Sequence, residues 1–128
     1  MEDRAEFCRQ LAQDAGRLAH TAFGTSPTSM KGRHDVLTAM DREVERFVRA
    51  ALAAHFPDDA VIGEEEGGNP GERVWLIDPI DGTANFARSI AHYCVSIGYL
   101  EHGVPTTCGI YDPSHDRLYT AQRGQGAW

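Results

Sequence analysis

Apolar residues in the first part of the chain recur every three or four positions, at Phe7, Leu11, Ala15, Leu18, Ala19 and Ala22. This spacing is typical of one face of a helix, so it predicts an amphipathic helix over residues 3–23. A second run with the same period predicts a helix over residues 39–55. Ser, Thr, Pro and Gly lie between the two, which predicts a loop over residues 25–33. Thr38 would cap the second helix, with Asp41 in its first turn.

The pattern changes to short apolar or alternating runs after residue 57, at residues 61–62, 74–77, 93–100, 104–111 and 117–122. Short polar turns separate the last three runs, as in an antiparallel meander. The sequence therefore predicts an α+β fold in which two N-terminal helices pack on a mostly antiparallel sheet. A chain of 128 residues is long enough for a single domain over residues 1–128.

Composition narrows the class of protein and its surroundings. The net charge of −7 argues against broad nucleic-acid binding, which requires a basic surface. There is no basic, apolar leader and no apolar run long enough to span a membrane, so we expect no membrane partner. Three widely spaced cysteines without a C-x-x-C pair fit a reducing compartment, and we expect a cytoplasmic protein.

The most informative stretch is an apolar run that ends in Asp78-Pro79-Ile80-Asp81. Two carboxylates delivered to one place resist ionising together unless a cation lies between them. Oxygen ligands of this kind suit Mg²⁺, and such a site can assist attack on a phosphate. An ordinary β-turn, with Asp first and Pro second, accounts for the same residues about equally well.

Four further residues could complete such a site, and three of them have a simpler interpretation. Glu64 follows a short apolar run and could be a third carboxylate ligand, or one member of a solvated acidic loop. Gly82 would let the backbone approach a ligand closely, and a helical turn that begins at Thr83 would direct free N–H groups at an anion. Thr83 could also hydrogen-bond an attacking water; its simpler role is the N-cap of that turn, and the two roles are compatible. Asp41 could accept a proton from Thr83, although a first-turn helix residue often only interacts with the helix dipole.

Taken together, these residues resemble the inositol monophosphatase family of metal-dependent, lithium-sensitive phosphatases. Gly63-Glu64-Glu65 and the stretch from Trp75 to Phe86 are similar to the metal signature of that family. Residues 35–41 resemble the segment before its second helix, and residues 123–128 resemble its Gly-x-Gly-Ala-aromatic turn. The resemblance implies a Mg²⁺-dependent phosphomonoesterase in which metal-activated water hydrolyses a small phosphorylated alcohol such as inositol monophosphate.

The resemblance also implies the metal ligands. Glu64 and Asp78 would bind one Mg²⁺, with the carbonyl oxygen of Ile80 as a further ligand. Asp78 and Asp81 would bind a second Mg²⁺, and a third, loosely held cation would lie near Glu64.

The remaining roles concern the substrate and the attacking water. Backbone N–H groups at Gly82 and Thr83 would hold the phosphate, and Thr83 with Asp41 would orient or deprotonate the water. The catalytic residues would thus be Thr83, Asp41 and Glu64, and the substrate would be bound by Ile80, Asp81, Gly82 and Thr83.

The resemblance departs from the family in length, because family members are considerably longer than this chain. Their second half supplies another aspartate ligand and most of the pocket for the alcohol. We therefore expect the N-terminal half of a layered sugar-phosphatase fold. It would be a homodimer or associate through the surface that the missing half covers. A catalytically incomplete metal- or phosphate-binding fragment remains an alternative. So does a related phosphatase for fructose bisphosphate, histidinol phosphate or a nucleotide 3′-phosphate.

Overall fold

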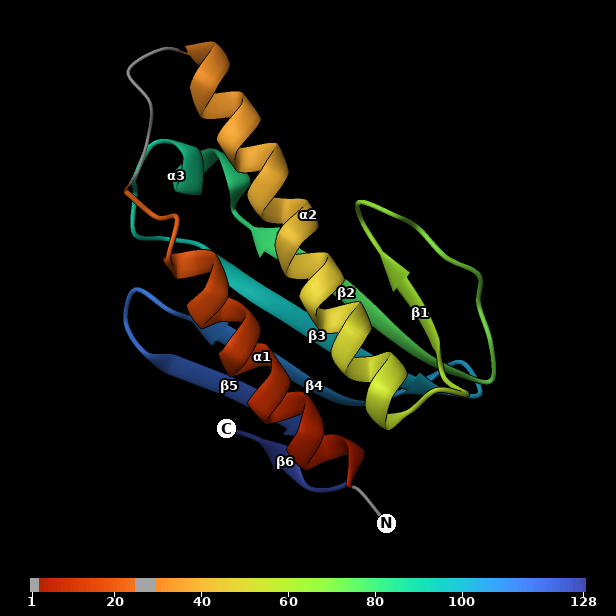
Figure 1. The fold of residues 1–128 in the computed structure, drawn as a ribbon. Helices are drawn as coiled ribbons and strands as arrows, with labels where there is room; N and C mark the ends of the chain where they lie inside the picture. The colour runs from red at the N-terminus through yellow and green to blue at the C-terminus, as the bar shows by residue number, and fades with distance from the viewer. Residues whose placement is uncertain (1–2, 25–29) are drawn as a thin grey trace.

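The computed structural model describes residues 3–24 and 30–128, with side chains for residues 3–24 and 39–128. Figure 1 shows the elements in chain order, which are α1 (Arg4–His20), α2 (Met30–His55), β1 (Ala60–Gly63), β2 (Arg73–Asp81), α3 (Thr83–Ala87), β3 (Cys94–Glu101), β4 (Val104–Asp112), β5 (Arg117–Gln122) and β6 (Gly126–Ala127). This architecture confirms the α+β class.

The first helix agrees with its prediction, whereas the second begins earlier than predicted. The Asp3 side chain caps α1 by accepting a hydrogen bond from the Ala5 N–H at 3.0 Å. Because α2 begins at Met30, the predicted loop is wrong for residues 30–33, and residues 25–29 lie outside the described chain. Thr38 is therefore not a cap, and Asp41 lies in the interior of the helix. One glycine inside a helix costs only about 1 kcal/mol, so Gly32 does not end it.

The six strands form one sheet in sequence order, from β1 at one edge to β6 at the other. β1 and β2 are parallel, and every later pair is antiparallel. The predicted meander is thus confirmed. The β3–β4 turn depends on His102 and Gly103, whose φ angles of 52° and 78° place both in the left-handed region that such tight turns require.

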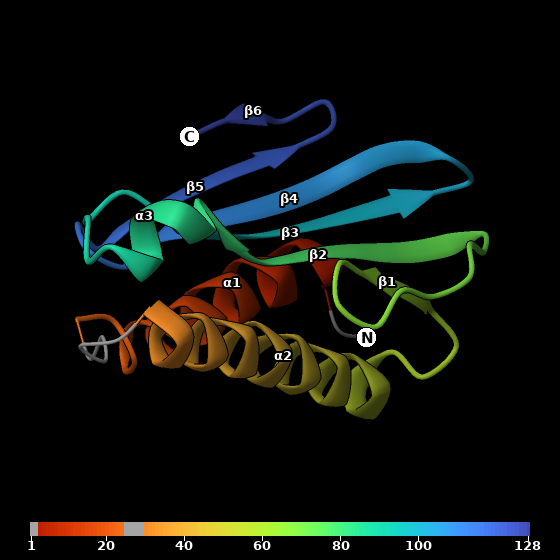
Figure 2. The same cartoon turned by 90° about the horizontal axis from the view of Figure 1, so that it is seen from above.

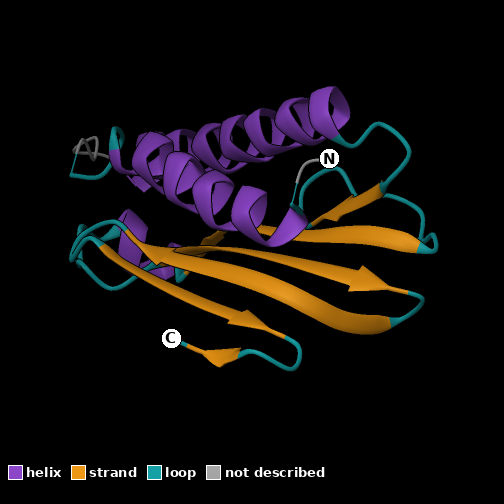
Figure 3. Cartoon of the chain, turned by 90° about the horizontal axis from the view of Figure 1, so that it is seen from below, coloured by secondary structure: helices purple, strands orange, loops and turns teal. Residues whose placement is uncertain are grey.

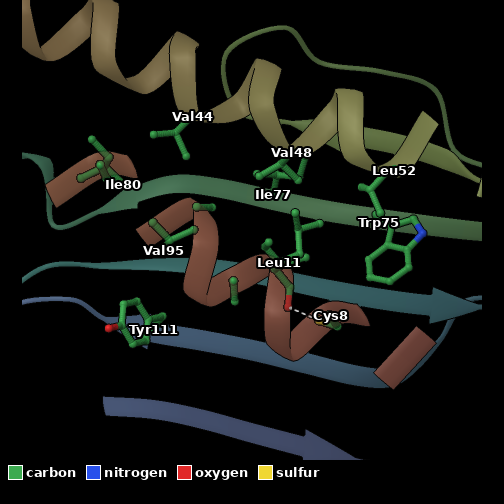
Figure 4. Close-up of a cluster of buried hydrophobic side chains, with 14 of the residues drawn as sticks. Cys8, Leu11, Val44, Val48, Leu52, Trp75, Ile77, Ile80, Val95 and Tyr111 are labelled. Carbon is green, nitrogen blue, oxygen red and sulfur yellow. Dashed lines mark hydrogen bonds between the residues drawn. The ribbon is translucent and has the colours of Figure 1, made fainter. Parts of the chain in front are cut away.

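Both long helices cover the same face of the sheet (Figures 2 and 3). Trp75, Ile77 and Val95 point from this face toward α1 and α2, where they meet Leu11 and Val48 (Figure 4). Full burial of an aliphatic or aromatic side chain of this size stabilises a fold by about 1.5–3 kcal/mol. This core holds β2 in place, and the C-terminal end of β2 carries Asp78 and Asp81.

The opposite face of the sheet has no helix over it in the described part of the chain (Figure 3). Leu76 and Tyr119 project from this face and are 41% and 49% exposed. None of the described helices combines the length and apolar character needed to cross a lipid bilayer.

Candidate active site

The parallel pairing of β1 and β2 places two of the predicted acidic residues side by side. Gly63 of β1 lies beside Ile77 of β2 in the register. Because parallel strands run in the same direction, Glu64 and Asp78, the next residue after each member of this pair, lie at the same end of the two strands. Hydrogen bonding to Glu64 is one of the causes of the raised pKa of Asp78, which indicates that the two carboxyl groups lie close together.

A β-bulge brings the third predicted acidic residue to the same face. Asp78 pairs with Ser96 of β3 and Asp81 pairs with Cys94, so two β2 residues oppose one β3 residue between these pairs. Residues three apart on a regular strand point to opposite faces, whereas the partners Ser96 and Cys94 share a face. The bulge therefore lets Asp78 and Asp81 share a face. Pro79, which has no N–H to donate, lies within the bulge. Because both aspartates belong to β2, the simple β-turn interpretation is wrong.

Asp78 is half-buried, and its surroundings disfavour its charge. Its pKa is raised from 3.8 to about 7 by burial first, and then by the hydrogen bond and charge of Glu64 and the charge of Asp81. A hydrogen bond with the Ile80 backbone acts in the opposite direction. Asp78 Oδ1 is buried and has no hydrogen-bond partner among the described residues. This oxygen is thus a buried hydrogen-bond acceptor that the described residues leave unsatisfied.

Asp41 belongs to the same acidic group as Glu64 and Asp78, although it lies in the interior of α2 and not in its predicted first turn. The residue is 8% exposed, and its Oδ1 is a second buried carboxylate oxygen without a partner in the described chain. Burial raises its pKa from 3.8 to about 7, and the charges of Glu65, Glu64 and Asp78 add to the effect. Asp41 is therefore placed to hold or release a proton near neutral pH.

The predicted helical turn at Thr83 is confirmed, with a different cap. α3 begins at Thr83, and its N-cap is Gly82, which has a φ of 96°. A Cβ atom at Gly82 would lie 3.0 Å from the His92 carbonyl oxygen and 3.2 Å from Tyr93 Cα. Glycine is required here by both the backbone conformation and the close approach of the chain. Thr83 is thereby the first helical residue rather than the cap.

Two hollows open beside these residues on the helix-free face of the sheet. One of about 380 Å³ includes Glu64, Asp78 and Ser96 in its lining. The other, of about 310 Å³, adjoins Asp81 and Gly82 and is lined further by Asn85, His92, Tyr93, Cys94, Ile110, Asp112 and Tyr119. A small ligand can thus reach both sides of the Asp78–Asp81 bulge.

Among the residues that the structure describes, no three His, Cys, Asp or Glu side chains are grouped so that they could hold a metal ion. The roles assigned to Glu64, Asp78, Ile80 and Asp81 as metal ligands therefore stay predictions. The structure brings the side chains of Glu64 and Asp78 together and lets Asp81 share their face.

One buried carboxylate of this region, Glu45, was not predicted from the sequence. Glu45 is fully buried, lies one helical turn after Asp41 and accepts hydrogen bonds from the Glu65 and Glu66 N–H groups. The signal available was a glutamate within the apolar stripe of α2, flanked by Val44 and followed by further buried positions. A charged residue on such a stripe requires buried partners.

Known proteins of one family are similar to this chain in sequence. The model of the inositol monophosphatase family matches residues 1–128. A Nus factor SuhB of Xylella fastidiosa is 43% identical over 98 residues, which cover 76% of this chain and 36% of that protein. A fructose-1,6-bisphosphatase/inositol-1-monophosphatase of Thermotoga maritima is 32% identical and is matched over 98% of this chain and 50% of its own.

The fold is also similar to solved structures. The structure of a Thermotoga maritima IMPase superposes with a TM-score of 0.87 at 29% identity, covering 99% of this chain and 51% of that one. The chain spans half or less of the length of the two curated relatives given above. The match of the family model over all 128 residues, together with this shared fold, shows that the chain belongs to the inositol monophosphatase family.

Proposed function

We propose that the chain is part of a Mg²⁺-dependent phosphomonoesterase that hydrolyses a small phosphorylated alcohol, such as inositol monophosphate. The observation that carries the proposal is the meeting of Glu64 and Asp78 at the end of β1 and β2, with Asp81 brought to the same face by the bulge. Family membership supports the reaction class.

The chemistry of the donor set suits a divalent cation, although in the described residues the carboxylates are not grouped around one point. The candidate donors are carboxylate oxygens of Glu64, Asp78 and Asp81 with the carbonyl oxygen of Ile80, which is the oxygen-only set that Mg²⁺ prefers. The unpartnered Asp78 Oδ1 provides a buried acceptor that lacks a partner in the described chain. When bound, Mg²⁺ supplies positive charge to the phosphoryl oxygens and lowers the pKa of coordinated water.

The protein's own groups would act on the substrate and on the water. The backbone N–H groups of Gly82 and Thr83, at the start of α3, would donate hydrogen bonds to the phosphate. The Thr83 hydroxyl would orient the attacking water. Asp41, whose pKa is near 7, would accept a proton from that hydroxyl or from the water.

The test measures Mg²⁺ uptake and phosphate release by the 128-residue chain, alone and with the second half of a longer relative. Asp81→Asn removes one candidate ligand at nearly constant volume, and we expect it to abolish Mg²⁺-dependent phosphate release. Asp58→Asn changes an exposed carboxylate before β1 and serves as the matched control. Retained release in the Asp81 variant, or no Mg²⁺ uptake by the unmodified chain, would contradict the proposal.

A second candidate is favoured by the helix-free face of the sheet. Leu76 and Tyr119 expose large apolar surfaces there, and the two hollows open on the same side. A chain of this kind could be a metal- or phosphate-binding fragment that acts only with another chain, either a second copy or the remaining half of the family fold. If the chain binds Mg²⁺ but releases phosphate only after the second half is added, this candidate is correct.

The substrate is a separate question. The named relatives include a fructose-1,6-bisphosphatase/inositol-1-monophosphatase, which supports sugar phosphates as well as inositol phosphates. A panel of inositol monophosphate, fructose bisphosphate, histidinol phosphate and a nucleotide 3′-phosphate, assayed on the reassembled protein, would rank them by kcat/KM.

A further inference from the structure

Glu45 lies beside the acidic turn formed by Glu64, Glu65 and Glu66, which directly follows β1. Its side chain is fully buried, and its two oxygens each accept a backbone hydrogen bond from that turn. Oε1 accepts from the Glu65 N–H at 2.8 Å, and Oε2 accepts from the Glu66 N–H at 2.9 Å. Hydrogen bonds to an ionised carboxylate are stronger than neutral ones, so this pair fixes the backbone on the far side of Glu64.

The turn has a closed geometry into which the Glu45 carboxyl fits. Gly63 and Gly67 exchange two backbone hydrogen bonds, of 3.1 and 2.9 Å, so the turn returns on itself. A Cβ atom at Gly63 would clash with the Glu45 carboxyl group, which shows how closely that group packs against the strand end. Glycine at position 63 is therefore what gives the carboxylate access to the two N–H groups.

The buried charge of Glu45 has a cationic partner. Arg49, one helical turn further along α2, donates from Nε to Glu45 Oε2 at 3.1 Å and also donates to the Gly67 carbonyl. Its Nε lies 3.8 Å from Glu66 Oε2. A buried carboxylate with a cation and two N–H donors is compensated, so this arrangement holds α2 to the turn without an unpaired charge.

We propose that Glu45 is a positioning residue for Glu64, setting the direction in which Glu64 faces Asp78; this rests on the proposed Mg²⁺ site. Glu64 lies between two fixed points. Gly63 before it is held in register with β2, and Glu65 after it is held by Glu45. Without the second point, the like charges of Glu64, Glu65 and Glu66 would drive the turn apart, away from Asp78.

The first measurement needs no variant and no metal. Glu65 and Glu66 are exposed residues at the tip of a turn, and such amides normally exchange rapidly with solvent. Because their N–H groups bond to a buried carboxylate, we expect each amide to exchange at least about tenfold more slowly than an unbonded amide. Hydrogen exchange by NMR on the 128-residue chain measures this, and unprotected amides at both positions would overturn the proposal.

The second measurement uses Glu45→Gln with Glu43→Gln as the matched control on an exposed face of α2. A glutamine amide would direct N–H groups at a backbone N–H or at Arg49, so we expect exchange at Glu65 and Glu66 to be about tenfold faster. The Mg²⁺ Kd from titration calorimetry should rise about tenfold in Glu45→Gln and stay unchanged in Glu43→Gln.

The outcomes separate this proposal from the proposed function. If Glu45→Gln lowers the urea midpoint but leaves the Mg²⁺ Kd of the folded protein unchanged, Glu45 has only a structural role and the positioning proposal is overturned. If the unmodified chain takes up no Mg²⁺, the proposed function fails. In that case the exchange rates alone decide whether Glu45 holds the turn. If Glu45→Gln does not fold, the exchange rates of the unmodified chain still decide it.

Discussion

Replacing Asp41 with asparagine should stabilise the metal-free protein at neutral and higher pH. The native structure buries the Asp41 carboxyl beside Glu64, Glu65 and Asp78, and all these charges have the same sign. Asparagine has nearly the same volume and no charge. The substitution therefore removes an unfavourable charge without opening a cavity.

The size of the effect follows from the pKa of Asp41. An increase from 3.8 to about 7 corresponds to roughly 4 kcal/mol. Local relaxation and the high effective dielectric of real protein interiors reduce the gain to about 2 kcal/mol. Because the native carboxyl holds its proton more tightly than the unfolded one, the contribution of Asp41 to stability is fully present below pH 3.8 and is lost as the pH rises through about 7. Asparagine resembles the protonated form, so its advantage is near zero around pH 4 and complete around pH 8.

Urea unfolding of the unmodified chain and of Asp41→Asn, both free of divalent cations, measures the difference at the two pH values. Asp58→Asn is the control, since that aspartate is exposed and away from the acidic group. A gain in stability of the same size near pH 4 and near pH 8 would refute the electrostatic explanation. So would a loss of stability near pH 8.

Three other changes test separate parts of the structure. Mg²⁺ affinity should rise about tenfold between about pH 6 and pH 8, because Asp78 with a pKa near 7 must lose its proton; calorimetry showing no pH dependence would contradict this. Gly82→Ala should destabilise the fold by about 2 kcal/mol because of its φ of 96°, whereas Gly98→Ala, with open space around it, should change the urea midpoint little. Leu52→Ala should cost about 3 kcal/mol of unfolding free energy, and the same truncation at the 39% exposed Phe47 should cost less than about 1 kcal/mol by thermal melting.

The parts of the fold that were predictable are those encoded by local periodicity. The apolar spacing of α1 and the alternation in β3 and β4 depend on neighbouring residues alone, and both predictions were confirmed. The start of α2 was not predictable in this way. Gly32 and the polar residues near it are typical of a loop, but helix formers such as Met30 and Lys31 continue the helix when its far end is held by tertiary packing.

The site was predictable in its residue types and not in its geometry. The Asp-Pro-x-Asp-Gly stretch indicated two acidic groups, but nothing local shows that Asp78 and Asp81 share a face. That depends on a bulge formed against β3, from 13 to 18 residues away. Likewise Glu45 contacts N–H groups 20 and 21 positions later in the chain, and only the three-dimensional structure reveals that pairing.

The acidic group of Asp41, Glu64 and Asp78 is unfavourable to folding when no ligand is bound. Ionising Asp41 near neutral pH costs about 2 kcal/mol by the argument above, and Asp78 is displaced in the same direction. A cation that binds only the native state stabilises it by about 2.7 kcal/mol when present at a hundred times its Kd. Mg²⁺ at that level would offset the cost of one of these carboxylates. A site built by the β1–β2 pairing and the β2 bulge therefore makes physical sense as a ligand site, because in the absence of a ligand it only weakens the fold.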